Sequence, residues 1–407
     1  MKRILFVMLE IDSASGTCVM NDAVQLLENG WDVHILSYET KRKAPEGVCF
    51  EFVPRKLFQE LENRTENPRW KKLFAGLYRL QVAFFSCLWP LNSLTYPGKL
   101  ERAIRKQIDR NRYDVVVPVY TQLDPLIAVF RIKKRNPALK CVAYFIDSLS
   151  AGPTPRLLSE EGKIKKGLRW EARLCSAMDG VIFMESSRRH HERYSRLQPY
   201  YSKCVFLDIP ALVMRHDGGG NDAPVKKDRL VAAYAGSMPL RIRDPEYAFR
   251  VLSRMKDIPL DIVFVGPEAD EMKSVDTHGL DVRWVGRVPH EEVEKYMREA
   301  DVLINIGNNV PGMVPSKVFE YIAVKKPILS FAPTDDEPSI PYLEKYGSAC
   351  SVVGTDDFEE NVQAVRAFLT DLPRERLSDA DLERRFYNNL PRAFAEYIES
   401  AAREERD

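Results

Sequence analysis

Residues 301–331 read DVLINIGNNVPGMVPSKVFEYIAVKKPILSF. The stretches at 301–306 and 327–331 are largely apolar and do not alternate strictly, which is typical of strands covered on both faces in a parallel sheet. Between them, Ser316 is a candidate N-cap for a helix over residues 316–324. The stretch therefore predicts one βαβ unit of a parallel α/β sheet.

The same pattern extends in both directions along the chain. In the second half we expect further strands over 230–235, 260–265, 282–285 and 350–353, with helices over 245–255 and 291–299. In the first half we expect strands over 4–9, 33–37, 113–119, 141–146, 180–184 and 204–207, with a helix over 19–28. Each half is therefore predicted to be a doubly wound α/β domain.

Residues 217–222, Asp-Gly-Gly-Gly-Asn-Asp, are the expected linker between the two halves. Three consecutive glycines flanked by charge do not hold a regular element. A surface loop inside one domain is the alternative, but the βαβ pattern starts again after it, and 407 residues are too many for one compact core. We place a first domain at residues 1–215 and a second at residues 225–385.

The composition excludes several classes of protein. A hydrophobic share of 45% and a charged share of 29% exclude disordered, collagen-like and integral-membrane chains. Net charge is only +1, which argues against a nucleic-acid partner. The seven cysteines are scattered singly, which favours reduced thiols, and Glu10 and Asp12 end the first apolar run too early for a signal peptide. We therefore expect a cytoplasmic protein.

Candidate ligand loops follow from the topology. In open α/β sheets, ligands lie beyond the carboxyl ends of the strands, where helix N-termini favour anions. Gly236 and Ser237 follow the first strand of the second domain, and Arg241 and Arg243 come shortly after. Glycine lets the backbone approach a ligand and an arginine fork suits a diphosphate, although such an arginine is often only a solvated charge.

A second loop follows the strand at 282–285. Gly286, Arg287 and Val288 can present backbone groups to the edge of a nucleobase, whereas His290 is more typical of an exposed helix start.

The third loop leads into the helix at 316–324. Ser316 and Lys317 offer a hydroxyl, first-turn N–H groups and a cation to a phosphate. Glu320, one turn later, can accept hydrogen bonds from ribose hydroxyls. Together the three loops predict one nucleotide-diphosphate site in the second domain.

The third loop also resembles a family signature. Residues 315–329, PSKVFEYIAVKKPIL, resemble the signature of retaining glycosyltransferases of the GT-B fold, especially the large family four. The segments YAGSM (234–238), IVFVG (262–266), WVGRVP (284–289) and ADVLI (300–304) match that family in order and spacing, so the likeness covers nearly all of residues 229–355. In the first half, Gly16 and NGWDV (29–33) resemble the family's opening in pattern.

The resemblance implies a GT-B fold, in which two Rossmann-like domains face a cleft and the last helix, within residues 386–407, crosses back to the first domain. It also implies retaining transfer from a nucleotide-diphosphate sugar to a sugar or lipid-linked acceptor. It implies that Arg243 contacts the donor diphosphate, Glu320 the ribose, and Gly286, Arg287 and Val288 the base. The other expected donor-binding residues are Gly16, Gly236, Ser237, Pro315, Ser316 and Lys317.

The chain departs from the family pattern at Gly312. Many members carry a first glutamate at this position, eight residues before the one that matches Glu320, and it lies beside the transferred sugar. The form that begins Pro315-Ser316-Lys317 and lacks the first glutamate resembles a branch that acts on bacterial surface polysaccharides.

No metal and no cofactor are expected, because the chain has no Asp-x-Asp motif at a strand end. The nearest acidic cluster, Asp335-Asp336-Glu337, is interpreted as a solvated loop. GT-B enzymes instead neutralise the leaving diphosphate with helix dipoles and basic side chains. In the first domain, Asp147 follows the strand at 141–146 and is the candidate catalytic residue at the acceptor, with a helix N-cap as the alternative.

Two other functions remain open. A nucleotide-sugar epimerase shares the fold but needs a cluster of carboxylates and histidines in the cleft, and the sequence shows these residues only scattered. A non-catalytic nucleotide-sugar-binding partner in polysaccharide assembly is favoured by Gly312.

Residues 69–94 do not fit the βαβ pattern and belong to a helical insertion near residues 56–110. Aromatic and aliphatic residues gather there beside Arg69, Lys71, Lys72 and Arg79, but Arg79 and Gln81 interrupt the roughly 20 apolar residues that a bilayer span requires. We expect either a helix that binds peripherally at a membrane surface or a helix packed on its own domain or on a second subunit. The oligomeric state is left open.

Overall fold

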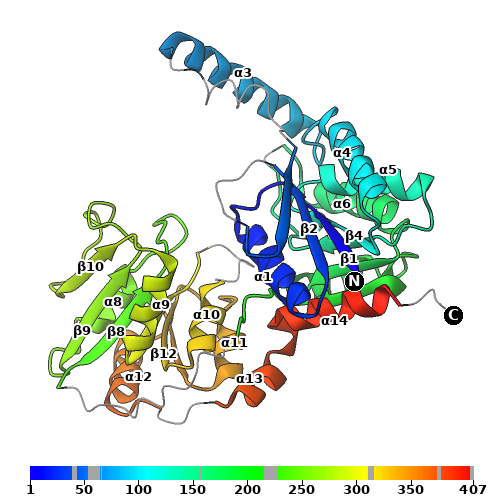
Figure 1. Ribbon diagram of the computed structural model, residues 1–407. Coiled ribbons are helices and arrows are strands. Elements are labelled where there is room, and N and C mark those ends of the chain that lie inside the picture. The colour runs from blue at the N-terminus through cyan, green and yellow to red at the C-terminus, as the bar shows by residue number, and fades with distance from the viewer. Residues whose placement is uncertain are drawn as a thin grey trace. The chain divides into compact units, whose positions relative to one another are not determined.

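A computed structural model describes residues 1–38, 44–53, 65, 67–155, 157–214, 228–309, 316–373 and 377–403. The chain forms two compact units, unit 1 (Met1–Pro210 with Asn388–Asp407) and unit 2 (Ala211–Tyr387). The expected linker at 217–222 lies outside the described residues. Each unit contains one parallel sheet flanked by helices (Figure 1).

Unit 1 has a seven-stranded parallel sheet in the order β3-β2-β1-β4-β5-β6-β7. Its strands are β1 (Arg3–Val7), β2 (Asp32–Ser37), β3 (Val48–Phe52), β4 (Val115–Tyr120), β5 (Val142–Phe145), β6 (Gly180–Met184) and β7 (Cys204–Leu207). The sequence pattern did not predict β3, because this edge strand leaves Cys49, Glu51 and Phe52 exposed and has no continuous apolar run.

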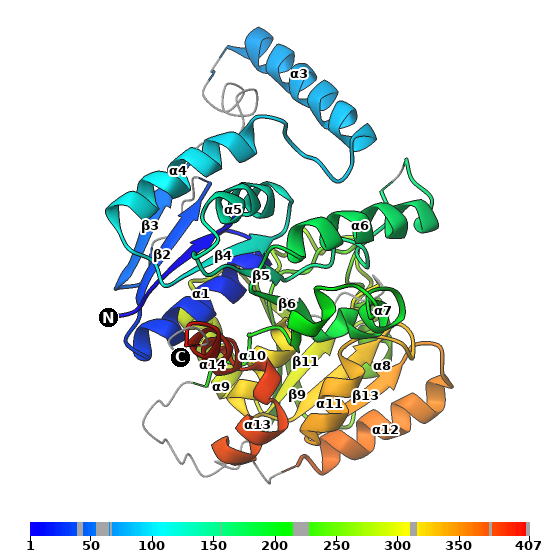
Figure 2. The same cartoon turned by 90° about the vertical axis from the view of Figure 1, so that its right-hand side faces the viewer.

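Helices cover both faces of this sheet (Figure 2). On one face lie α1 (Ala14–Glu28) and the C-terminal helix α14 (Pro391–Ala401), whose Phe394 contacts the rings of Phe6 and Tyr144. On the other face lie α4 (Tyr96–Arg110), α5 (Asp124–Arg135) and α6 (Glu160–Cys175). The last helix of the chain is thus part of the core of unit 1.

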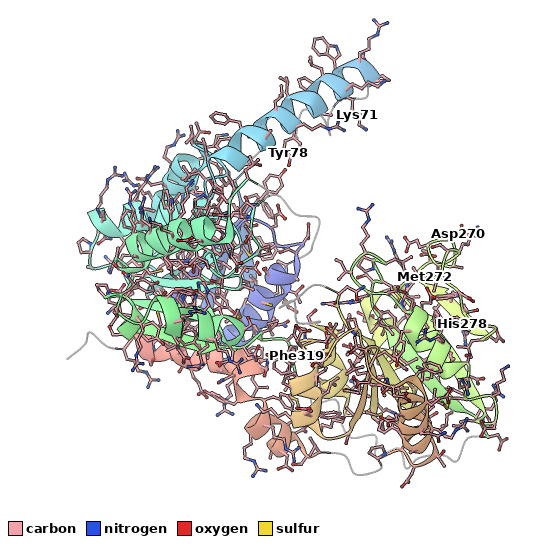
Figure 3. All side chains as sticks on the ribbon, turned by 180° about the vertical axis from the view of Figure 1, so that it is seen from behind. Lys71, Tyr78, Asp270, Met272, His278 and Phe319 are labelled. Carbon is pink, nitrogen blue, oxygen red and sulfur yellow. The ribbon has the colours of Figure 1, made fainter. Side chains whose placement is uncertain are left out.

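Helix α3 (Pro68–Cys87) extends from unit 1 away from its sheet (Figures 1 and 3). The Asn67 side chain caps it by accepting a hydrogen bond from the backbone N–H of Arg69, and Pro68 occupies a first-turn position. Much of the expected insertion before it, residues 54–64 and 66, lies outside the described residues. In the described part of the chain, no helix is both long enough and apolar enough to cross a membrane.

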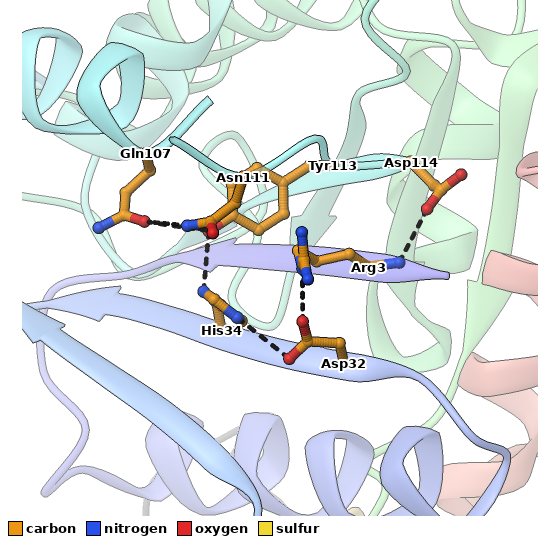
Figure 4. Close-up of polar contacts among 7 residues, drawn as sticks. All are labelled: Arg3, Asp32, His34, Gln107, Asn111, Tyr113 and Asp114. Atoms are coloured by element: carbon orange, nitrogen blue, oxygen red, sulfur yellow. Dashed lines mark hydrogen bonds and ion pairs between the residues drawn. The ribbon is translucent and has the colours of Figure 1, made fainter. Parts of the chain in front are cut away.

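A polar network ties the amino-terminal edge of this sheet to α4 (Figure 4). Arg3 and Asp32, the first residues of β1 and β2, form an ion pair, and Asp32 also lies 3.1 Å from His34 Nε2. The Tyr113 hydroxyl lies 2.9 Å from His34 Nδ1 and donates to Gln107 on α4 at 3.1 Å. These groups bind one another at the edge opposite the strand ends where ligands bind, so we assign them a structural role, although the buried Gln107 Nε2 has no hydrogen-bond partner among the described residues.

Unit 2 has a six-stranded parallel sheet in the order β10-β9-β8-β11-β12-β13. Its strands are β8 (Leu230–Ala235), β9 (Leu260–Val265), β10 (Val282–Gly286), β11 (Val302–Ile306), β12 (Ile328–Ala332) and β13 (Ala349–Val353). Its helices are α8 (Glu246–Leu252), α9 (His290–Glu299), α10 (Lys317–Val324), α11 (Ile340–Tyr346), α12 (Phe358–Thr370) and α13 (Asp379–Arg385). The predicted pair of doubly wound parallel sheets is confirmed.

Candidate functional site

In unit 2, β8 and β11 are neighbours in the sheet. The next two strands in the chain after β8 lie on one side of this pair, and the two strands that follow β11 lie on the other side. A crevice forms at such a switch point, because the loops after the two strands turn to opposite faces. Gly236 and Ser237 follow β8, and Asn308 follows β11. Two of the three predicted loops, the one after β8 and the one that runs from Asn308 after β11 into α10, therefore begin at one position in the sheet.

Arg243 is held at this position by three neighbours. Its Nε donates to Asn308 Oδ1 at 2.8 Å, and its Nη1 donates to the Ser237 carbonyl at 3.1 Å and to the Tyr234 hydroxyl at 3.4 Å. The Tyr234 hydroxyl itself donates to the Ser237 carbonyl at 2.8 Å, and burial raises the pKa of this tyrosine. Among the described residues, Arg243 Nη2 has no partner, so an anchored guanidinium keeps one donor edge for an anion.

The start of α10 lies against the same loop. A Cβ on Gly236, whose φ is +147°, would come within 3.3 Å of Lys317 Cε, so the lysine side chain passes over this glycine. Lys317 Nζ in turn pairs with Glu320 Oε2 at 2.6 Å. The Tyr321 hydroxyl binds both backbone groups of Ala235, at 2.8 Å and 3.1 Å, and fixes α10 on the end of β8.

Ser316 occupies the N-cap position of α10, as predicted, but its side chain makes no capping hydrogen bond. The first N–H groups of a helix have no partners within the helix, and the helix dipole favours an anion there. Pro315, like Gly312, lies outside the described residues.

A buried carboxylate supports this site, and the sequence interpretation of it was wrong. Glu337 was expected in a solvated acidic loop, yet it is only 2% exposed, whereas Asp335 and Asp336 are exposed. It accepts hydrogen bonds from the backbone N–H of Asn308 at 3.3 Å and from the backbone N–H and hydroxyl of Ser339. Glu337 thus positions the loop whose Asn308 holds the arginine. Nothing in the local sequence separates it from its exposed acidic neighbours.

The loop after β10 is held by hydrogen bonds within unit 2. Gly286 has φ +77°, a left-handed conformation that favours glycine, and a Cβ there would displace the Glu268 carboxylate, whose Oε2 would lie 2.7 Å away. The Gly286 carbonyl accepts from the N–H of Gly266 at 2.8 Å, and the Arg287 N–H donates to Glu268 Oε1 at 3.1 Å. Two backbone groups of this loop, the Gly286 carbonyl and the Arg287 N–H, therefore have partners within the chain, and the contact of Gly286, Arg287 and Val288 with a base stays a prediction. Val288 follows and is half-buried, and the His290 side chain lies outside the described part.

In unit 1, Asp147 lies beyond the carboxyl end of β5, as predicted. It is not a helix N-cap, because the next helix, α6, begins at Glu160 and is capped by Ser159. The side chain is exposed, while desolvation by neighbouring protein raises its pKa.

Gly16 has a packing role within unit 1. It lies in the first turn of α1, and a Cβ there would lie 2.0 Å from the Ile11 carbonyl oxygen, so only glycine lets this loop pass the helix.

The structure also gathers residues of unit 1 that the sequence shows scattered. Glu171 accepts from the Ser150 N–H at 2.9 Å and the Ser150 hydroxyl at 2.8 Å, and burial raises its pKa to about 7. His190 Nε2 lies 2.9 Å from the same hydroxyl. His191 Nε2 lies 3.3 Å from Ser148 Oγ, and burial lowers its pKa to about 3, so this histidine is neutral.

In the described parts of both units, no three His, Cys, Asp or Glu side chains converge as a metal site would require. In unit 2, the side chains described at the switch point are the cations Arg243 and Lys317, the carboxylates Glu320 and Glu337, and neutral hydrogen-bonding groups. Such a set suits a ligand that combines phosphates with hydroxyl groups.

Comparison with known families gives one match. The family described as "Glycosyl transferases group 1" matches residues 229–371, which include β8, β11, α10 and the unit 2 site residues described in this section. The match lies within unit 2 and covers less than half of the chain. No curated protein matches the chain in sequence.

Solved structures match almost the whole chain. WaaG, a glycosyltransferase involved in lipopolysaccharide biosynthesis, is 13% identical, with 97% of this chain and 99% of WaaG covered and a TM-score of 0.56. The lipopolysaccharide outer core galactosyltransferase WaaB is 10% identical, with 98% of each chain covered and a TM-score of 0.57. A putative UDP-N-acetylglucosamine 2-epimerase from Listeria monocytogenes is 10% identical, covers 100% of this chain and 98% of its own, and has a TM-score of 0.56. Likeness at this identity shows the fold, and the fold is GT-B.

Proposed function

We propose that this chain is a glycosyltransferase that moves a sugar from a nucleotide-diphosphate sugar to an acceptor, with retention of configuration and without a metal ion. The observation that carries the proposal is the anchored Arg243, whose open donor edge lies beside the loop that Lys317 crosses. Both residues lie inside the segment that matches the group 1 family.

In the proposed reaction, the bond between the sugar and the diphosphate breaks and negative charge develops on the leaving phosphate. Arg243, Lys317 and the first turn of α10 would stabilise that charge, because they are positioned before the reaction begins. Glu320 would bind the ribose, and the acceptor hydroxyl would lose its proton near Asp147 in unit 1. The acceptor that we propose is a lipid-linked or polysaccharide intermediate, in keeping with the lipopolysaccharide transferases among the structural neighbours.

An epimerase is the second candidate, and one specific observation favours it. Elimination at the sugar ring needs a cluster of carboxylates and histidines as acid and base. Unit 1 contains such a group, which is formed by Ser148, Ser150, Glu171, His190 and His191. Glu171, however, is completely buried and both of its oxygens already bind Ser150, so it is better suited to hold the loop after β5 than to exchange protons with a sugar.

A thermal-shift screen of UDP-, GDP- and ADP-sugars tests donor binding, because a ligand at about 100 times its Kd stabilises a protein by roughly 2.7 kcal/mol. With the donor identified, release of the nucleoside diphosphate in the presence of an acceptor extract tests transfer. Binding without acceptor-dependent release would support the non-catalytic alternative, and a change of the sugar without acceptor would support the epimerase. Proton NMR of the product then tests retention, since an inverted anomeric centre would contradict it.

A further inference from the structure

Helix α3 carries an exposed apolar stripe. Its members recur every three or four residues and therefore lie on one side of the helix: Trp70, Leu73, Phe74, Leu77, Leu80 and Phe84. The exposed fractions are 54% for Trp70, 48% for Leu73, 68% for Leu80 and 56% for Phe84. These four side chains therefore do not pack into their own domain, which was one of the expected alternatives. A contiguous exposed stripe of this kind marks an interaction surface.

The charge of α3 is entirely positive. The helix contains Arg69, Lys71, Lys72 and Arg79, all exposed, and no Asp or Glu. At 100° per residue, Lys72 and Arg79 fall opposite the middle of the apolar stripe and Lys71 falls at its margin. Figure 3 labels Lys71 near the end of α3 that is distant from the sheet of unit 1. Since the whole chain has a net charge of only +1, this concentration of positive charge is local.

The next helix continues the positive charge. On α4, Lys99, Arg102, Lys106 and Arg110 are exposed and recur every three or four residues, so they form one stripe along the helix. The buried residues of α4, including Leu100 and Ile104, lie on its other side. Asp109 is the exposed acidic residue of this helix, so its outer surface remains strongly cationic.

We infer that α3 binds a membrane surface that contains anionic lipid, lying in the plane of the interface with its apolar stripe among the acyl chains. Aromatic and aliphatic residues on one side of a helix, with lysine and arginine on the other, are the composition of interfacial helices. A helix of 20 residues is about 30 Å long, which gives the stripe several turns of contact. The inference does not rest on the proposed function, although a lipid-linked acceptor would be found at the same surface.

A second copy of the chain is the competing occupant, and the charge argues against it. In a two-fold symmetric pair, the same patch meets itself, so two α3 helices that each carry four positive charges would lie side by side. No carboxylate of α3 is present to offset this repulsion. An anionic lipid surface instead attracts every one of these residues, and each contributes roughly fivefold to binding.

Vesicle flotation of the full chain tests the inference. The protein should float with vesicles of phosphatidylcholine containing about one third phosphatidylglycerol, and not with phosphatidylcholine alone, at low salt. Raising the salt to about 0.5 M should reduce the bound fraction, because it screens the attraction. The fluorescence of Trp70 should shift to shorter wavelength on binding, and Trp70→Phe should remove that shift.

Two sets of variants separate the apolar and the electrostatic contributions. Leu73→Ser with Phe84→Ser should abolish flotation without lowering the melting temperature, since both side chains are about half exposed. The matched control is Leu157→Ser with Leu197→Ser, two leucines of unit 1 outside α3 that are 63% and 97% exposed, and it should float normally. A triple variant should bind anionic vesicles more weakly, by on the order of 100-fold. Its substitutions are Lys71→Ala, Lys72→Ala and Arg79→Ala.

Three results would overturn the inference. The first is a wild-type protein that stays with the soluble fraction in anionic vesicles. The second is a dimer in analytical ultracentrifugation that the Leu73→Ser, Phe84→Ser variant dissociates, because the stripe would then be a subunit interface. The third is a fall in melting temperature in that variant beyond the fall in the control, which would make the stripe part of the fold.

Discussion

Lys317 Nζ lies 2.6 Å from Glu320 Oε2, one turn along α10, so the two residues that we assign to phosphate and ribose form an ion pair with each other. Both side chains are partly exposed, and such a pair adds only about 0.2–1 kcal/mol to stability. Its effect on the site is positional, because it holds the lysine over Gly236. Changes at the two residues should therefore be non-additive in donor binding.

The donor site is tested by Arg243→Ala and Glu320→Ala. Each should weaken binding of the nucleotide sugar by about 1.5–3 kcal/mol, the range for hydrogen bonds to charged groups. Isothermal titration calorimetry measures the affinity, with Arg283→Ala, an exposed arginine on β10, as the control that should bind normally. Unchanged affinity in both site variants, with intact circular dichroism, would place the nucleotide site elsewhere.

Glu337 is predicted to act on the donor without touching it. Glu337→Ala leaves the Asn308 N–H and the Ser339 groups without their buried partner, which should cost about 1–3 kcal/mol of unfolding free energy. Donor affinity should also fall, because Asn308 orients Arg243. Chemical denaturation and calorimetry measure the two effects, and Asp335→Ala, at an exposed position in the same cluster, should show neither. A stable variant with weakened binding would still agree with a positioning role, whereas normal binding would not.

Turnover is predicted to survive removal of divalent ions. The charge on the leaving diphosphate would be balanced by Arg243, Lys317 and the N-terminus of α10 rather than by a metal ion. The measurement is the initial rate in excess EDTA. Complete loss of activity that manganese restores would rule out the proposed metal-independent mechanism.

Asp147 is predicted to act on the acceptor and not on the donor. Asp147→Asn should lower turnover by about 100-fold or more, the contribution of a positioned proton acceptor, and leave donor affinity unchanged. Since desolvation raises the pKa of this carboxyl, the acid limb of the pH–rate profile should lie above the usual range for aspartate and should vanish in the variant. Wild-type turnover in Asp147→Asn would remove this residue from the mechanism.

Asp22 on α1 gives unit 1 a predictable dependence on pH. The side chain is fully buried and neither oxygen makes a hydrogen bond of normal geometry to a described residue. Burial raises its pKa well above the usual range, an effect that the nearby Tyr144 hydroxyl only partly opposes. In the folded chain, the Asp22 carboxyl therefore stays protonated above the ordinary aspartate pKa of about 3.9. The unfolded chain loses this proton in the same pH range. Asp22 therefore makes folding less favourable as pH rises.

Asp22→Asn removes the ionisation and nearly preserves the shape of the side chain. Its melting temperature should exceed that of the wild type at about pH 8, and the difference should shrink at about pH 5. A difference that stays constant or grows towards acidic pH would show that Asp22 is ionised in the folded chain.

Several parts of the molecule could be predicted from sequence alone. The bounds of β8 (Leu230–Ala235) and β9 (Leu260–Val265) agree with the predicted strands, because a parallel strand buried on both faces is a continuous apolar run. The same reasoning did not predict the edge strand β3, since only Val48 in it is buried and three of its five residues are exposed. The motif at residues 315–329 resembles a glycosyltransferase signature, and the match of residues 229–371 to the group 1 family agrees with the broader expectation of a glycosyltransferase, while family four stays a prediction.

Contacts between distant residues were decided only by tertiary structure. Arg243 meets Asn308, 65 positions later, because β8 and β11 are neighbours, and strand order depends on how all the helices pack rather than on either loop. The burial of Glu337 beside exposed Asp335, and the exposure of Phe84 on α3, have the same origin. Periodicity determines which side of an element is apolar, and that information is local. Whether that apolar side is buried depends on which other parts of the chain pack against it. A local sequence pattern does not contain this information.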